Sequence, residues 1–187
     1  MGLSIGYQIR ARAVLSPEKA RRLLGQWARE IRRAQLGRPG PITAVDPARS
    51  RFQYWITQRL NDTDSVGLNV PPRSGFSCTV EIGAGCEPLV LGLCRYPGRV
   101  TLGGRVRAVP GGWYLRGFCK TEYAALHGLD HFVDCHRRVI AILGAMPYGA
   151  VNVAIDDEGG FWPHRDERRL RTSIVESQRG IAGHDLP

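Results

Sequence analysis

The segment "FSCTVEIGAGCEPLVLGLCRYPGRVTLGGRVRAVPGGWYLRGFCKT", residues 76–121, decides the fold class of this chain of 187 residues. Its β-branched, aromatic and aliphatic residues gather in four runs, residues 76–82, 88–96, 99–109 and 112–121. Glycine or proline separates the runs about every ten residues, which is typical of an antiparallel meander. The segment therefore predicts consecutive antiparallel strands, not strands that alternate with helices.

Outward from this segment, helices and strands are predicted on both sides. Residues 5–15 alternate apolar and polar side chains, as a half-buried strand does. Ser16 is a predicted N-cap, with Pro17 at the first position of a helix that runs to about residue 36. Further elements are predicted at residues 51–60 (strand), 126–143 (helix), 150–155 (strand) and 164–177 (helix).

This order predicts an α+β fold, since a run of strands stands apart from the helices. We expect an antiparallel or mixed sheet of about five to seven strands, with two or three helices packed mainly on one face. Residues 1–187 are expected to form a single domain. A polar, glycine- and proline-rich stretch at about 61–75 predicts a mobile loop, and the tail is expected to fray from about residue 179.

The charge balance is strongly basic, with a formal net charge of +9. Only Lys19 and Lys120 of the 26 cationic residues are lysines. An arginine-rich surface favours phosphates and carboxylates, because guanidinium binds them with two hydrogen bonds. The alternative is that a GC-rich genome encodes arginine whatever the function, and net charge alone does not decide between the two.

The cysteines predict a reducing compartment. There are five, an odd number, and none forms a C-x-x-C pair. The first residues have no basic segment followed by an apolar one, and no apolar run approaches the roughly 18 residues that a membrane span needs. We therefore expect a cytoplasmic protein with free thiols and no membrane partner.

The predicted helix at 126–143 carries three histidines. His127 and His131 have the i, i+4 spacing that can grip a metal, with Asp134 as a third candidate ligand. However, all three lie on the side opposite the apolar stripe, no Glu follows the first histidine, and no further ligand is brought there by the sequence. We expect a solvated helix face, no metal site and no cofactor.

His136 falls in the middle of the apolar stripe, so it needs polar partners for both ring nitrogens. Two segments at strand ends, residues 118–123 and 156–166, could supply them. The candidate catalytic residues are Cys119 as nucleophile, His136 as base and Asp157 as the group that orients it. The candidate binding residues nearby are Lys120, Glu122, Glu158 and Trp162. The alternative is a satisfied core histidine, with the acids forming a turn.

Two nucleotide-binding patterns are weak. The G-x-G of "EIGAGCEP" follows a strand but leads into another strand, which excludes a Rossmann loop. Arginines cluster on the first and last helices, but acids are interleaved with them and aromatic side chains are not, so solvated helix faces are favoured. These arginines are Arg29, Arg32, Arg33, Arg168, Arg169 and Arg171.

The segments "GAGCEPLVLGLCRYP", "GWYLRGFCKTEYA", "DHFVDCHRRVIAIL" and "DEGGFWPHRD" together resemble a family of uncharacterised bacterial proteins, common in planctomycetes. That family has similar segments in the same order, and the resemblance covers roughly residues 75–170. Glu122 stands where the family has Gln, and Pro163–His164 stand where it has Glu. The resemblance implies a bacterial cytoplasmic setting and a coherent fold, and it transfers no function.

Three functions are expected in order of preference. The first is a non-enzymatic module that binds a small ligand or a protein partner, since no pattern reaches the standard of a specific catalytic signature. The second is a cysteine-nucleophile hydrolase or transferase that uses Cys119 and His136. The third is arginine-mediated binding of nucleic acid, which is less favoured and requires one contiguous arginine face.

Overall fold

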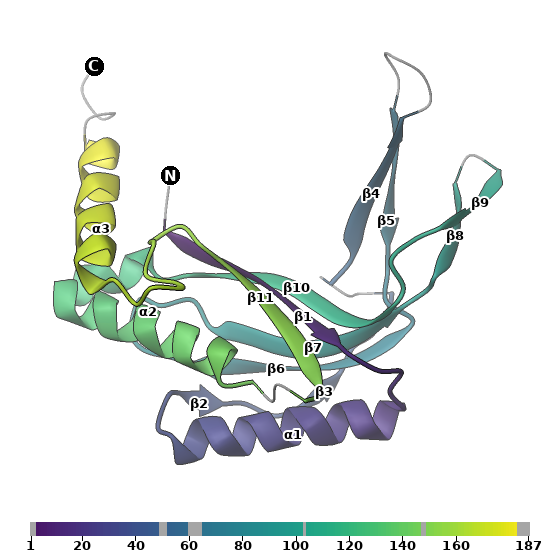
Figure 1. Cartoon of the computed structure of the whole chain (residues 1–187), viewed down its shortest axis with the longest axis horizontal. Helices are drawn as coiled ribbons and strands as arrows, with labels where there is room; N and C mark the ends of the chain where they lie inside the picture. The colour runs from purple at the N-terminus through teal and green to yellow at the C-terminus, as the bar shows by residue number, and fades with distance from the viewer. Residues whose placement is uncertain (1–2, 49–51, 60–64, 103, 147–148, 183–187) are drawn as a thin grey trace.

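The computed structural model describes residues 3–48, 52–59, 65–102, 104–146 and 149–182. Its elements confirm the predicted α+β class, with a mostly antiparallel sheet and helices that lie mainly on one side of it (Figure 1). None of the helices in these ranges is long and apolar enough to span a membrane.

The main sheet has seven strands, and every pairing in it is antiparallel. Six of them lie in the order β11-β1-β10-β7-β6-β2, and β3 also pairs with β6. Their bounds are β1 Ser4–Ala11, β2 Arg38–Pro39, β3 Thr43–Ala44, β6 Ser74–Glu81, β7 Leu89–Tyr96, β10 Gly112–Lys120 and β11 Val151–Asp157. The short strands β2 and β3 lie in a stretch whose proline and glycine content predicts only a loop.

Helix α1 (Pro17–Arg33) begins as its sequence predicts. The Ser16 side chain accepts a hydrogen bond from the Lys19 N–H, and Pro17 takes the first position. Helix α2 (Leu129–Gly144) starts three residues later than predicted, because residues Glu122–His127 form a separate 3₁₀ helix, η1. The last helix, α3 (Glu167–Ala182), continues past residue 179, where fraying is predicted, and residues 183–187 lie outside the described part.

Two hairpins stand apart from the main sheet. Strand β4 (Tyr54–Arg59) pairs with β5 (Ser65–Val70), and β8 (Arg99–Leu102) pairs with β9 (Arg105–Ala108). The prediction of a mobile loop at 61–75 is therefore wrong for residues 65–70, while residues 61–64 lie outside the described part. Both hairpins project away from the sheet on the side opposite α1 (Figure 1).

Alternating side chains give the sheet two different faces. On β10, Leu115 and Cys119 are fully buried, whereas Arg116 and Phe118 between them are exposed. The buried face packs on apolar stripes of α1 and α2, which include Leu24 and Ile140. The face that carries Arg116 and Phe118 is called the outer face below.

Candidate functional site

The predicted polar partners of His136 are present. Its Nδ1 lies 2.9 Å from the Thr121 hydroxyl oxygen, and its Nε2 lies 3.0 Å from Oδ1 of Asp157. The second contact is short but poorly aligned for a hydrogen bond. Both side chains of the pair are fully buried, at 0% exposure. The residues therefore tie α2 to the ends of β10 and β11 inside the core.

Asp157 is also bonded to the turn that follows it. Its Oδ1 accepts a hydrogen bond from the Gly159 N–H, and its Oδ2 accepts one from the Trp162 N–H, each at 2.8 Å. Burial alone raises the pKa of Asp157, but the His136 ring and the two N–H groups outweigh it and leave the pKa below its usual value. The carboxylate is thus held ionised as a structural acceptor.

The polar contacts of Cys119 are with Glu87 and Cys86. Its thiol donates a hydrogen bond to the Glu87 carbonyl at 3.1 Å and lies 4.0 Å from the sulfur of Cys86. It has no exposed surface, and the Cys86 thiol together with burial raises its pKa far above the usual range. A protonated, enclosed thiol is not a nucleophile, so the described geometry gives the hydrolase hypothesis no support.

Two of the predicted binding residues anchor the start of β1. Glu122 accepts a hydrogen bond from the Leu3 N–H at 3.1 Å, and Glu158 accepts bonds from the N–H and the hydroxyl of Ser4 at 2.9 and 2.8 Å. These two carboxylates accept hydrogen bonds from residues at the start of β1, so their role is structural. They do not converge on a common cavity with His136.

The other two predicted binding residues also make contacts within the chain. The Lys120 N–H donates to the Glu87 carboxylate at 3.1 Å. The partly buried ring of Trp162 lies under the guanidinium of Arg165, whose Cζ is 5.0 Å from the ring centroid. The predicted cluster is therefore brought together only in part, around His136, Thr121 and Asp157.

His131 differs from its predicted solvated position. Its Nε2 donates to the Ala84 carbonyl at 2.9 Å, and the sulfur of Cys135 lies 3.5 Å from the same nitrogen. The ring thus fastens α2 to the loop between β6 and β7. Among the residues that the structure describes, no group of three or more His, Cys, Asp or Glu side chains could hold a metal ion.

Two of the six clustered helix arginines, Arg33 and Arg171, form ion pairs with carboxylates of the described residues. Arg33 pairs with Glu30, and Arg171 contacts both Asp130 and Glu167 at 2.7 and 2.9 Å. Arg137 and Arg138 are paired in the same way. These contacts balance part of the positive charge of the helices locally.

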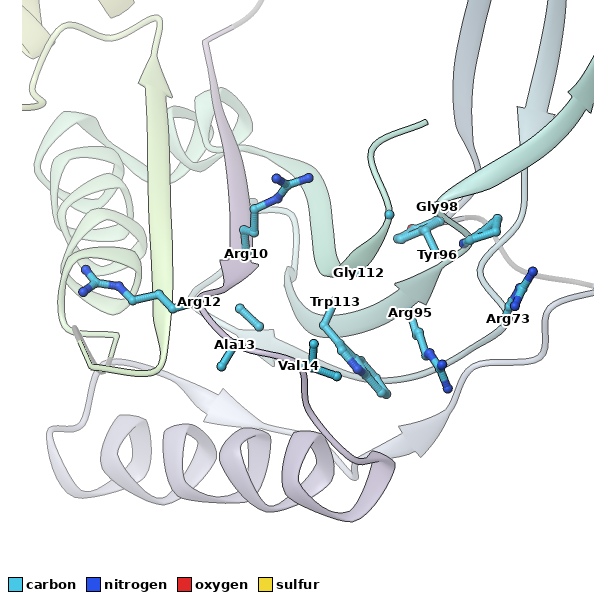
Figure 2. A pocket seen from close by; sticks show the side chains of 13 residues that line it. Arg10, Arg12, Ala13, Val14, Arg73, Arg95, Tyr96, Gly98, Gly112 and Trp113 are labelled. Atoms are coloured by element: carbon cyan, nitrogen blue, oxygen red, sulfur yellow. The ribbon is translucent and has the colours of Figure 1, made fainter. Parts of the chain in front are cut away.

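A different set of arginines lines a cavity of about 410 Å³ at the far end of β1. The set consists of Arg10, Arg12, Arg73 and Arg95, and all four are exposed. Arg12 donates to the Asn152 side chain at 2.7 Å, and the Arg10 guanidinium lies over the Tyr114 ring. None of the four forms an ion pair with a carboxylate of the described residues. Figure 2 shows their guanidinium groups spread around the cavity rather than aimed at one point.

The chemical signal for this arginine cavity is an absence of acids. No Asp or Glu occurs between Glu87 and Glu122, and none occurs before Glu18. Sequence reasoning that looks for clusters of arginine misses the site, because its members come from the end of β1, the segments just after β1 and just before β6, and the end of β7. These acid-free stretches contain Arg10, Arg12 and Arg95, whereas Arg73 lies outside them.

Comparison with known proteins found no family model, no curated protein and no solved structure that matches this chain, so its resemblance to the bacterial family stays a prediction.

Proposed function

We propose that this chain is a non-enzymatic binding module whose ligand is an extended anion held by Arg10, Arg12, Arg73 and Arg95. One observation carries the proposal: four arginines line a single cavity and have no carboxylate partner among the described residues. Guanidinium groups without a paired carboxylate leave their positive charge unbalanced, and a bound anion with several charges neutralises it.

The spread of the four guanidinium groups favours a chain of charges over a single small anion. In Figure 2 the Arg12 and Arg73 side chains lie on opposite sides of the cavity and point away from each other. One phosphate ion could not reach both. A linear polyanion that passes along the cavity could contact each arginine in turn, with two hydrogen bonds to a guanidinium wherever the geometry allows.

Titration with linear polyphosphate in a calorimeter tests this proposal. We expect Arg73→Gln/Arg95→Gln to lose affinity by about tenfold or more, since each charge-assisted hydrogen bond contributes about 1.5–3 kcal/mol. The matched control is Arg29→Gln/Arg33→Gln, which removes the same charge from the exposed face of α1. Equal losses in the two variants, or no binding by the unaltered protein, would overturn the proposal.

We infer a cytoplasmic location from the thiols. All five cysteines are free and buried in the structure. Unpaired cysteines in this number are typical of a reducing compartment.

A further inference from the structure

A second cavity, of about 560 Å³, opens on the outer face of the sheet. Three aromatic side chains line it, Tyr7, Phe52 and Phe118, together with Arg116. Phe118 is 60% exposed, which is unusual for a large apolar ring and points to a surface that meets a ligand. This aromatic cavity is thus a place where a flat ring can stack beside a positive charge.

Gly117 lines the aromatic cavity and leaves room for the ring of Tyr7. Strand β10 pairs with β7 only from Gly112 to Tyr114, so the two strands separate beyond that point. The ring of Tyr7 lies across Gly117, where an added Cβ would come within 2.7 Å of the Tyr7 Cζ. The Tyr7 hydroxyl then donates to the Val90 carbonyl at 2.6 Å, which fixes the ring in the gap.

One strand connects the aromatic cavity with the arginine cavity. Along β10, Phe118 and Arg116 line the first, and Gly112 lines the second. Tyr114 lies between Gly112 and Arg116 on β10 and pairs with Arg10 of β1. Outward-facing residues on a strand are about 7 Å apart, at two rises of about 3.3 Å. Between the two cavities, the outward positions of β10 are therefore Phe118, Arg116 and the largely buried Tyr114.

Positive charge predominates around the outer face of β10. The hairpin of β8 and β9 beside it carries Arg99, Arg105 and Arg107, and Nε of Arg107 is buried without a hydrogen-bond partner among the described residues. One acid, Glu87, lines the aromatic cavity, and its carboxylate accepts a hydrogen bond from the Lys120 N–H at 3.1 Å. Asp156, also on the outer face, lies opposite Gly6 on the far side of β1. The outer face along β10 therefore keeps an excess of positive charge, from Arg116 and from Arg10 opposite Tyr114.

We propose that the extended anion is single-stranded nucleic acid, with phosphates on the arginine cavity and a base stacked on Phe118 in the aromatic cavity. This inference rests on the proposed function and names its ligand class. Aromatic rings beside a basic groove bind single strands, whose bases are free to stack. A duplex encloses its bases, and polyphosphate has none, so neither can use Phe118.

Fluorescence anisotropy with labelled oligonucleotides of equal length tests the inference. The probes are oligo-dT, oligo-rU and a DNA duplex, and polyphosphate with the same number of charges serves as competitor. We expect both single strands to bind more tightly than the duplex and polyphosphate. Tighter binding of oligo-rU than of oligo-dT would identify RNA as the source, and the reverse order would identify DNA.

Phe118→Ala separates stacking from charge. We expect it to weaken single-strand binding about tenfold, in the range of base–aromatic stacking, and to leave polyphosphate affinity unchanged. Phe118→Tyr should retain binding. The matched control is Tyr123→Ala, which removes another exposed ring, 50% exposed, that lines neither cavity. Circular dichroism confirms that each variant is folded.

The outcomes distinguish the two proposals. If Phe118→Ala has no effect, or the duplex binds more tightly than the single strands, the nucleic-acid inference is wrong. The proposed function would still stand if polyphosphate binding depended on Arg73 and Arg95. If no anion binds to the unaltered protein, both proposals fail.

Discussion

The Nε2 atom of His136 lies 3.0 Å from Oδ1 of Asp157, and neither side chain has any exposed surface. Thr121 on the other side of the ring is buried as well. The arrangement resembles part of a catalytic triad, but solvent and substrate have no access to it. Its role is to satisfy a histidine in the core, because a buried imidazole without polar partners would destabilise the fold.

His136→Ala should lower the free energy of unfolding by about 3–5 kcal/mol, since it leaves the buried Asp157 carboxylate without the imidazole and opens a cavity in the core. Urea denaturation measures this difference. His127→Ala, on the exposed side of the chain, is the control and should change stability by less than about 0.5 kcal/mol. Polyphosphate binding by folded His136→Ala should be unchanged, because His136 lines neither cavity. A stable variant that loses binding would contradict the structural role.

The lowered pKa of Asp157 predicts a specific acid dependence of stability. An unfolded aspartate has a pKa of about 3.9, so the stabilisation by ionised Asp157 is fully present above that value. It is lost as the pH falls through the lower pKa of the folded state. The stability difference between the unaltered protein and Asp157→Asn should therefore be largest near neutral pH and shrink below about pH 4. Urea unfolding across this range measures it, and a difference that grew in acid would contradict the assignment.

Much of the fold could be predicted from interactions between residues that are close in the sequence. The cap at Ser16, the alternation along β1 and the inward direction of His136 each depend on residues within one or two turns. The sequence also predicts that Asp157 lies near His136, because polar groups at strand ends are the closest partners for a core imidazole. These predictions succeed since they need no knowledge of distant pairing.

Strand pairing at a distance was harder to predict. Residues 65–70 form β5 although their surroundings are polar and rich in glycine and proline, because pairing with β4 supplies the backbone hydrogen bonds. The run 99–109 is predicted as one piece of the meander but folds back on itself as β8 and β9. The arginine cavity is likewise non-local, since Arg12 and Arg73 are brought together only by the tertiary fold.

The buried thiols predict an order of alkylation. Burial raises the pKa of Cys94 to about 12 and that of Cys135 to about 11, whereas the hydrogen bond with Cys119 lowers the pKa of Cys86. Because the thiolate is the reactive form, Cys86 should be alkylated first by iodoacetamide, and the native protein as a whole should react slowly. Peptide mass spectrometry identifies the modified residue. All five cysteines should react in denaturant, and early labelling of Cys119 would contradict the order.

The salt dependence of binding provides a direct count of phosphate contacts. For single strands, the logarithm of affinity falls with the logarithm of salt concentration with a slope of about −0.7 per neutralised phosphate. If each of the four cavity arginines meets one phosphate, the cavity contributes a slope of about −3.

Arg95→Gln should make that slope shallower by about 0.7, since one counterion-releasing contact is removed. Phe118→Ala should lower the affinity at every salt concentration without changing the slope, because stacking releases no counterions. Anisotropy titrations of oligo-rU and oligo-dT at several sodium chloride concentrations measure both effects. Arg33→Gln, on the exposed face of α1, is the control and should leave slope and affinity unaltered. An Arg95→Gln variant with an unchanged slope would mean that Arg95 does not contact the phosphates, and the path along the cavity would have to be abandoned.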